Sequence, residues 1–182
     1  IDGAAPSYAL VGSADDSLFT INPSTGELSF VNAPDFENPT DAGSKSIDNL
    51  SVQVSDGRGA QVTHALEVRV DDVNETPSLT AVNLTSSEGF VGDIGSLIMT
   101  DPDVDDQLTL SIVGGDAQAF FSVDPSSGTV SQESSVAPGL YTLQVQLHDA
   151  NGMSTTATLL IRIDAVQPSL GAANSANSTS SN

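Results

Sequence analysis

Apolar and polar residues alternate with a period of two along several stretches of the chain. Residues 50–55 (Leu-Ser-Val-Gln-Val-Ser), 66–70 (Leu-Glu-Val-Arg-Val) and 143–148 (Leu-Gln-Val-Gln-Leu-His) all follow this pattern, which is typical of half-buried strands. Residues 22–26 (Asn-Pro-Ser-Thr-Gly) and 124–128 (Asp-Pro-Ser-Ser-Gly) predict tight turns, because Pro presets one dihedral angle and Gly accepts a positive φ. No stretch has helical periodicity. The pattern therefore predicts an all-β fold of short antiparallel strands arranged as a sandwich.

The same series of motifs occurs twice. Tyr8–Gly12 and the following Phe19–Gly26 are matched by Leu110–Gly114 and Phe121–Gly128, 102 residues later. A later block, Ser51–Gly57, is matched 93 residues later, so the first copy holds 9 additional residues. This is a tandem domain repeat, and it predicts two sandwiches in series.

Composition limits the classes of partner. The 182 residues suffice for two domains of about 90 to 100 residues each. The 24 acidic and 4 basic residues give a net charge of -20, which excludes nucleic acid and anionic membranes as partners. Without cysteine there is no disulfide or zinc–thiolate site, and no apolar run is long enough for membrane insertion. Any export signal is expected outside this chain. Residues 167–182 are mainly small and polar, which predicts a flexible tail.

Acidic residues gather around residues 71–77, Asp-Asp-Val-Asn-Glu-Thr-Pro, between the two copies. Asp35-Phe36-Glu37 precedes this stretch, and Asp101-Pro102-Asp103 and Asp149 follow it. Oxygen ligands from two domains and their linker are what a hard cation such as calcium requires. The clusters therefore predict a calcium-stiffened joint. The alternative is an acidic surface that only keeps a secreted or salt-adapted protein soluble.

The order of these motifs resembles cadherin-type repeats. The motifs on which the resemblance rests are Phe-x-Ile/Val-x-Pro-x-x-Gly, a later Asp-Phe-Glu, a strand ending in Asp-Gly or Asp-Ala-Asn-Gly, and a closing Asp-Val-Asn-Glu. The form of residues 72–77 is similar to the bacterial variety of the family. The resemblance implies two tandem Greek-key, immunoglobulin-like sandwiches. It divides the chain into repeat 1 (1–72), a calcium-binding linker (73–77), repeat 2 (78–166) and the tail (167–182).

The resemblance also implies a ligand set for about two calcium ions. Repeat 1, the linker and repeat 2 each contribute to it. The expected ligands are Asp35 and Glu37 from repeat 1, Asp72, Asn74 (through its side chain or its backbone carbonyl) and Glu75 from the linker, and Asp101, Asp103 and Asp149 from repeat 2. The alternative role for each single carboxylate is to cap a turn.

The two copies also depart from the family pattern. Repeat 2 has Ser-Ser-Val-Ala-Pro at 134–138 in place of Asp-Phe-Glu and closes with Asp-Ala-Val-Gln-Pro at 164–168. No second calcium joint is therefore expected below repeat 2. Glu88 matches the early glutamate of the family, which would serve that joint, so no role is expected for it. Repeat 1 lacks its first strand, roughly 25 residues by comparison with repeat 2. The chain is then a fragment of a longer array, or it has a groove filled by a strand from another chain. Asp2 and Asp56 could form half of an upstream site.

The leading hypothesis is a calcium-rigidified structural or adhesion module at the cell surface or outside the cell, with other protein domains or copies of itself as partners. One alternative is a filament subunit assembled by strand exchange. Another is a carbohydrate-binding module, for which Phe36 and Tyr141 are the candidate aromatic residues. An enzyme is disfavoured, because His64 and His148 fall on polar sides of strands and no nucleophile elbow or phosphate loop occurs.

Overall fold

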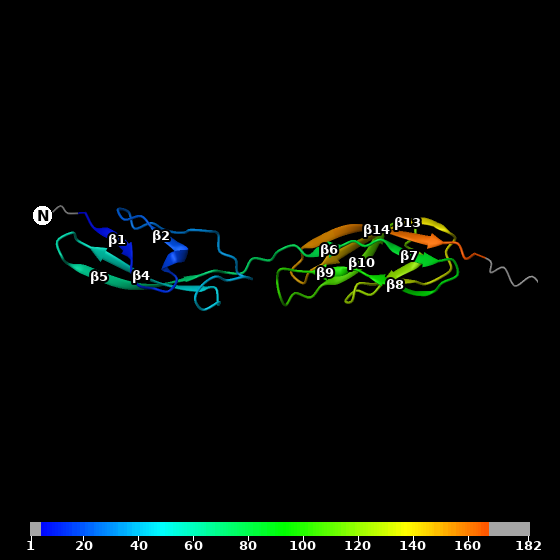
Figure 1. Cartoon of the computed structure of the whole chain (residues 1–182), viewed down its shortest axis with the longest axis horizontal. Coiled ribbons are helices and arrows are strands. Elements are labelled where there is room, and N and C mark those ends of the chain that lie inside the picture. The colour runs from blue at the N-terminus through cyan, green and yellow to red at the C-terminus, as the bar shows by residue number, and fades with distance from the viewer. Residues whose placement is uncertain (1–4, 168–182) are drawn as a thin grey trace, which may run out of the picture. The chain divides into compact units, whose positions relative to one another are not determined.

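The computed structural model describes residues 5–167 and divides into two compact units, Ile1–Asn74 (unit 1) and Glu75–Asn182 (unit 2) (Figure 1). Asp2 and all but the first residue of the predicted tail lie outside the described residues. Strands dominate both units, and one 3-10 turn, η1 (Asp16–Leu18), is the helical element of the described chain. Between residues 5 and 167, no helix has the length and apolar character needed to cross a bilayer.

Unit 1 consists of two small antiparallel sheets. The first has the order β1-β4-β5, and the second pairs β2 with β3. The strand bounds are β1 Ser7–Leu10, β2 Phe19–Ile21, β3 Leu28–Phe30, β4 Ile47–Ser55 and β5 Gln61–Arg69. Phe19 and Leu50 are the buried apolar side chains among the described residues of this unit, and the ring centroids of Phe19 and Phe30 lie 4.3 Å apart. Its core is therefore small.

Unit 2 has a larger set of sheets with the orders β10-β13-β14-β7, β11-β12-β8 and β6-β9. The strand bounds are β6 Ser78–Thr80, β7 Leu84–Ser87, β8 Gly92–Ser96, β9 Ile98–Thr100, β10 Thr109–Gly114, β11 Phe121–Val123, β12 Thr129–Gln132, β13 Gly139–His148 and β14 Ser154–Asp164. Alternate residues of β13 and β14, among them Leu143, Val145, Leu159 and Ile161, are buried in one cluster. The period of two in the sequence thus marks the core face, and the prediction of all-β Greek-key sandwiches is confirmed.

One strand pair departs from the antiparallel pattern. β7 runs parallel to β14, with Leu84 opposite Ile161 and Ser86 opposite Ile163. Side-chain alternation identifies the buried face of a strand, but it carries no information on the direction of the neighbouring strand.

The two predicted turns are held by equivalent side chains. Asn22 Oδ1 accepts hydrogen bonds from the Ser24 and Thr25 amides at 2.9 and 3.2 Å. Asp124 Oδ1 accepts from the Ser127 and Ser126 amides at 2.7 and 3.0 Å. Hydrogen bonds from Ser127 and then Ser126 lower the pKa of Asp124 to about 2, because they stabilise the charged form.

Burial differs between equivalent strands of the two units. In β14, Leu159, Ile161 and Ile163 are buried, whereas in β5 Leu66 is 41% exposed and Val68 is only half-buried. The sequence predicts a half-buried strand at residues 66–70, which overlap β5. β5 is more exposed because, among the described residues, it pairs only with β4, whereas β14 lies between β13 and β7.

Candidate metal centre

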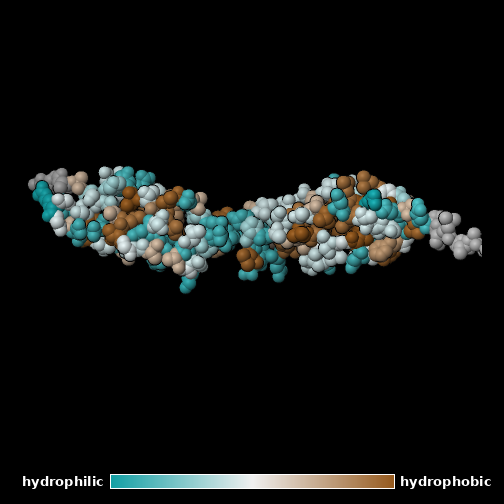
Figure 2. Space-filling model, viewed as in Figure 1, coloured by the Kyte–Doolittle hydropathy of each residue, from teal (hydrophilic) through white to brown (hydrophobic). Residues whose placement is uncertain are grey.

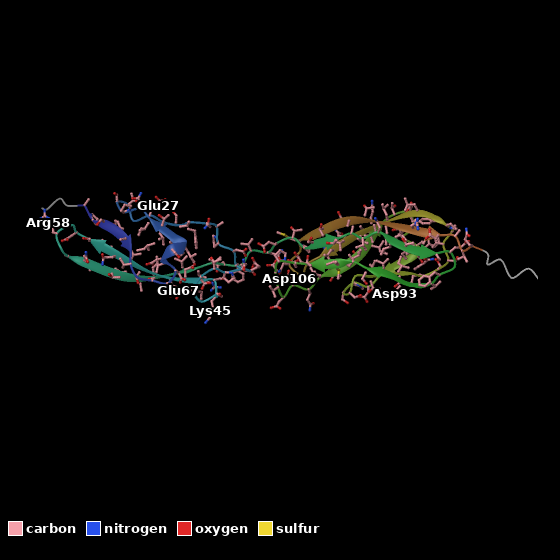
Figure 3. The ribbon with its side chains drawn as sticks, viewed as in Figure 1. Glu27, Lys45, Arg58, Glu67, Asp93 and Asp106 are labelled. Carbon is pink, nitrogen blue, oxygen red and sulfur yellow. The ribbon has the colours of Figure 1, made fainter. Side chains whose placement is uncertain are left out.

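Three aspartates form an acidic cluster at one end of unit 2. Asp101 follows β9, Asp106 lies in the loop before β10, and Asp149 follows β13. One carboxylate oxygen of each lies within 4.8 Å of the other two. Asp149 is 7% exposed, and Asp106 lies at the end of the unit where the chain enters it (Figure 3). We call Asp101, Asp106 and Asp149 the three-aspartate cluster.

Short hydrogen bonds from the loops orient this cluster. Asp149 Oδ1 accepts from the amides of Gly152 and Met153 at 2.5 and 2.8 Å, in the tight β13–β14 connection. Both Asp106 oxygens lie 3.2 Å from the Asn151 side-chain nitrogen, which donates to them. The loops thus hold both carboxylates in place.

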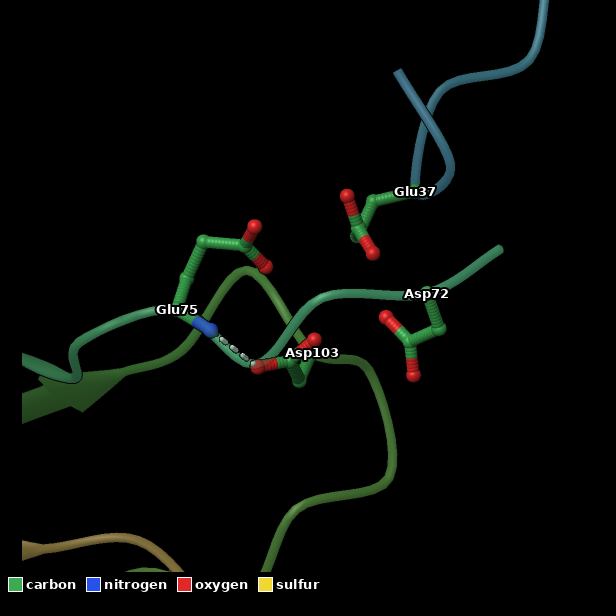
Figure 4. A group of neighbouring side chains, drawn as sticks. All are labelled: Glu37, Asp72, Glu75 and Asp103. Atoms are coloured by element: carbon green, nitrogen blue, oxygen red, sulfur yellow. Dashed lines mark hydrogen bonds between the residues drawn. The ribbon is translucent and has the colours of Figure 1, made fainter. Parts of the chain in front are cut away.

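Asp103 links the cluster to the segment that enters unit 2. Its Oδ2 atom accepts a 3.0 Å hydrogen bond from the Glu75 amide (Figure 4), and its own amide donates to Asp101 Oδ1 at 3.1 Å. The remaining oxygens, Asp101 Oδ2 and Asp103 Oδ1, are buried, and neither accepts a hydrogen bond from the described residues. Buried carboxylate oxygens without donors are costly, so these atoms fit the coordination of a cation.

Electrostatics at this end of unit 2 favour a bound cation. Burial, followed by the carboxylates of Asp149, Asp103 and Asp101, raises the pKa of Asp106 above its ordinary value. Like charges disfavour the ionised form of each neighbour, and a divalent cation among them would reverse this repulsion.

The predicted ligands of unit 1 differ in whether they lie near another carboxylate. Glu37 and Asp72 bring one carboxylate oxygen each to within 4.8 Å of the other (Figure 4). Asp35 is exposed, and its Oδ1 accepts a 3.0 Å hydrogen bond from the Asn38 amide, as a turn cap does. Asn74 is half-buried at the end of the unit. In unit 2, Glu75 and Asp103 also have one carboxylate oxygen each within 4.8 Å of the other.

Sequence reasoning did not single out Asp106. Its signal is the spacing Asp101-x-Asp103-x-x-Asp106 in one acid-rich loop. Loop positions have no periodicity to separate a ligand from a solvated carboxylate, so this spacing alone would not have distinguished Asp106 from its neighbour Asp105.

A second acidic group, in unit 1, serves the fold. Asp15 Oδ1 and Oδ2 accept from the amides of Ala42 and Asn49 at 2.7 and 2.8 Å, which ties the first loop to β4. Asp41 and Asp48 are also buried beside a pocket of about 60 Å³. Burial, followed by the charges of Asp15 and Asp41, raises the pKa of Asp48.

Replacing Asp48 with asparagine is expected to stabilise unit 1 at neutral pH by about 1 kcal/mol. Asp48 is 3% exposed, and its carboxyl group has no hydrogen bond within residues 5–167. Its pKa is higher in the folded than in the unfolded state, so its ionisation lowers stability above the folded pKa. The gain from Asp48→Asn should therefore shrink as the pH falls through that value. Urea denaturation between pH 3.5 and 7.5 measures this.

The control for that experiment is Asp71→Asn, which changes the net charge equally at an exposed carboxylate paired with Arg69 at 2.9 Å. It should leave stability within about 0.5 kcal/mol of the wild type. A loss of stability in Asp48→Asn at pH 7, or a gain that does not depend on pH, would contradict the assignment.

Comparisons with known proteins point to one kind of domain. No protein-family model matches the chain. Human Protocadherin Fat 4 is 29% identical over 147 residues, which cover 74% of this chain and 3% of that protein. Human Protocadherin-7 is 27% identical over 164 residues, 82% of this chain and 15% of that protein. The chain thus spans a small part of the length of these relatives.

Solved structures agree on the fold. The EC1-2 segment of human Protocadherin-24 has a TM-score of 0.68 at 22% identity, covering 91% of this chain and 84% of that one. The EC22-24 segment of mouse Cadherin-23 has a TM-score of 0.64 at 26% identity, covering 91% of this chain and 55% of that one. Together the relatives and structures support cadherin-like domains. The resemblance to the bacterial variety stays a prediction, since the matches described here are to mammalian proteins.

Proposed function

We propose that the chain is a calcium-rigidified structural and adhesion module of a cell-surface or secreted protein. The observation that carries the proposal is the three-aspartate cluster together with the buried oxygens of Asp101 and Asp103 that accept no hydrogen bond from the described residues. The cadherin-like relatives support the same class of function.

The linker supplies the second argument. Asp72 and Glu75 are three residues apart, so their Cα atoms are at most about 10 Å apart in any arrangement of the units. In unit 1, a carboxylate oxygen of Asp72 lies within 4.8 Å of one from Glu37. In unit 2, a carboxylate oxygen of Glu75 lies within 4.8 Å of one from Asp103. Each of these two couples is a pair of neighbouring carboxylates. Calcium takes 6–8 oxygen ligands at 2.3–2.6 Å, more than either pair offers. We infer that ions shared by both pairs join the units.

The proposed ligands are the eight predicted from the sequence together with Asp106, for about two ions. Asp35 is the weakest member, because it already caps a turn. Asp101, Asp106 and Asp149 would hold an ion within unit 2, and Glu37, Asp72, Glu75 and Asp103 would hold the bridging one. The bound ions would neutralise the carboxylates and limit the motion of the linker.

Other protein domains or further copies of the chain are the proposed partners, and the proposed location is extracellular. Calcium modules of extracellular proteins bind with Kd values of about 10⁻⁴–10⁻³ M, which suits that location. Glycan binding has little support in the described residues: Phe36 is 36% exposed but no second aromatic side chain is paired with it there, and the Tyr141 hydroxyl donates to the Ala137 carbonyl at 2.9 Å.

Calorimetric titration of calcium into the chelator-treated chain tests the joint. We expect saturable binding of about two ions in the sub-millimolar to millimolar range, with the bridging ion lost in the double variant Asp72→Ala with Asp103→Ala. The control is Asp71→Ala with Asp105→Ala, which removes the same charge from two exposed neighbours and should bind as the wild type does. Equal binding by both double variants, or no saturable binding by any chain, would refute the proposal.

A further inference from the structure

A pocket in unit 1 places a buried carboxylate beside apolar walls. Asp48 of β4 lines this pocket and is 3% exposed. The apolar part of the lining comes from η1, β3, the β3–β4 connection and the residue after β5: Leu18, Phe30, Ala33, Pro34, Pro39 and Val70. The volume is about 60 Å³, which is room for roughly four to six water-sized groups. We call this the Asp48 pocket.

Asp48 is a carboxylate without a hydrogen-bond donor. Within residues 5–167, its side chain accepts no hydrogen bond. The two neighbouring carboxylates differ, because Asp15 and Asp41 each accept from backbone amides with both of their oxygens. A buried charge without a donor is costly. The fold thus keeps Asp48 at a loss of stability, which is common where a residue serves binding rather than folding.

The charges around the Asp48 pocket favour a positively charged occupant. Burial, followed by the carboxylates of Asp15 and Asp41, raises the pKa of Asp48, and a cation beside it would oppose all of these effects. Lys45, the one lysine of the chain, is exposed and extends away from the unit (Figure 3). The net charge of -20 draws cations toward the protein, and hydrophilic residues border the apolar ones on the visible surface of unit 1 (Figure 2).

The Asp48 pocket fits an ammonium group better than a metal ion. Calcium takes 6–8 oxygen ligands, and the carboxylate groups of the described chain that lie close enough to share a metal do not include Asp48. An ammonium group needs only hydrogen-bond acceptors, and its bond to a carboxylate is charge-assisted. The methylene groups attached to it would cover the apolar walls, as those of lysine do elsewhere.

We propose that the Asp48 pocket binds a primary alkylammonium group, whose N–H donates to the Asp48 carboxylate while its alkyl chain packs against Phe30 and Val70. Free amines and the lysine side chains of a partner protein both carry this group. The site is separate from the proposed calcium ligands Asp101, Asp103 and Asp149, which belong to unit 2, so it does not depend on the calcium joint.

The test is an NMR titration of the full chain with n-butylammonium at constant ionic strength and constant calcium concentration. We expect saturable shifts at the amides of Ser46, Asp48 and Val70. Methylammonium should bind at least about tenfold more weakly, because it lacks three methylene groups that the apolar walls would bury. Tetramethylammonium has no N–H to donate, so it should give no saturable shift.

Asp48→Asn should weaken n-butylammonium binding by at least about tenfold, because it removes a charge-assisted hydrogen bond. Unfolding does not explain such a loss, since this variant is expected to be more stable. The matched control is Glu67→Gln, which removes the same charge from an exposed position on β5 (Figure 3) and should bind as the wild type does. Equal binding by the two variants, or equal binding of n-butylammonium and methylammonium, would overturn the proposal.

A second titration, with Nα-acetyl-lysine methylamide, identifies the source of the ammonium group. Binding as tight as that of n-butylammonium would support a lysine side chain of a partner protein. Binding of n-butylammonium alone would support a free amine. Absence of saturable binding by both compounds would refute the site.

Discussion

Replacing Gly115 with alanine is expected to destabilise unit 2 by about 2–5 kcal/mol. Gly115 follows the irregularity at the end of β10 and has a φ of +112°, which L-residues rarely adopt. A Cβ atom there would clash with the Thr142 carbonyl oxygen and lie 2.8 Å from the Leu143 Cα atom. Both belong to the backbone of β13, the central core strand, so neither can move aside cheaply.

Gly89→Ala separates the clash from the backbone strain. Gly89 also has a positive φ, +80°, but nothing lies within 4 Å of its Cβ position, so its cost is limited to about 1–2 kcal/mol of strain. Urea denaturation followed by the amide signals of β13 measures both variants in unit 2. Equal losses would show that the close approach of Gly115 to β13 does not matter.

The period of two was enough to predict the strands and their inward faces. Leu50 and Leu143 are equivalent in the repeat, and both are buried as the alternation predicts. The paired turns could also be predicted, because Asn22 and Asp124 each have a side chain that caps its own turn.

The burial of β5 could not be predicted in this way. Its alternation at Leu66 and Val68 matches that of β14, yet Leu66 is exposed in β5, which within the described residues has a strand on one edge only, while the equivalent Leu159 is buried in β14, which has strands on both edges. That is a long-range property of the fold, absent from the local pattern.

The candidate site was partly predictable for a similar reason. Asp149 stands directly after the predicted strand 143–148, so its position at one end of a unit could be expected, and Asp101 and Asp103 were expected beside it from the resemblance. Asp106 lies deeper in a polar loop, and only the folded path of the chain brings it to Asp149. Asp35 has the expected spacing, but it is occupied as a turn cap.

Calcium at a hundredfold excess over its Kd is expected to stabilise unit 2 by about 2.7 kcal/mol through the three-aspartate cluster. For a domain of this size, that gain corresponds to an increase in melting temperature of roughly 10–20 °C. The stabilisation arises because the folded state gathers three carboxylates that the unfolded chain keeps apart. Calorimetric melting with calcium and with chelator measures it.

Asp106→Ala should remove most of this increase, while Asp105→Ala, an exposed neighbour with the same charge, should retain it. In the absence of calcium, Asp106→Ala should melt no lower than Asp105→Ala, because it relieves the repulsion among the carboxylates that helps to raise the pKa of Asp106. The metal requires deprotonated ligands, so calcium stabilisation should weaken at acidic pH. A melting temperature that calcium raises equally in both variants would mean that Asp106 is not a ligand.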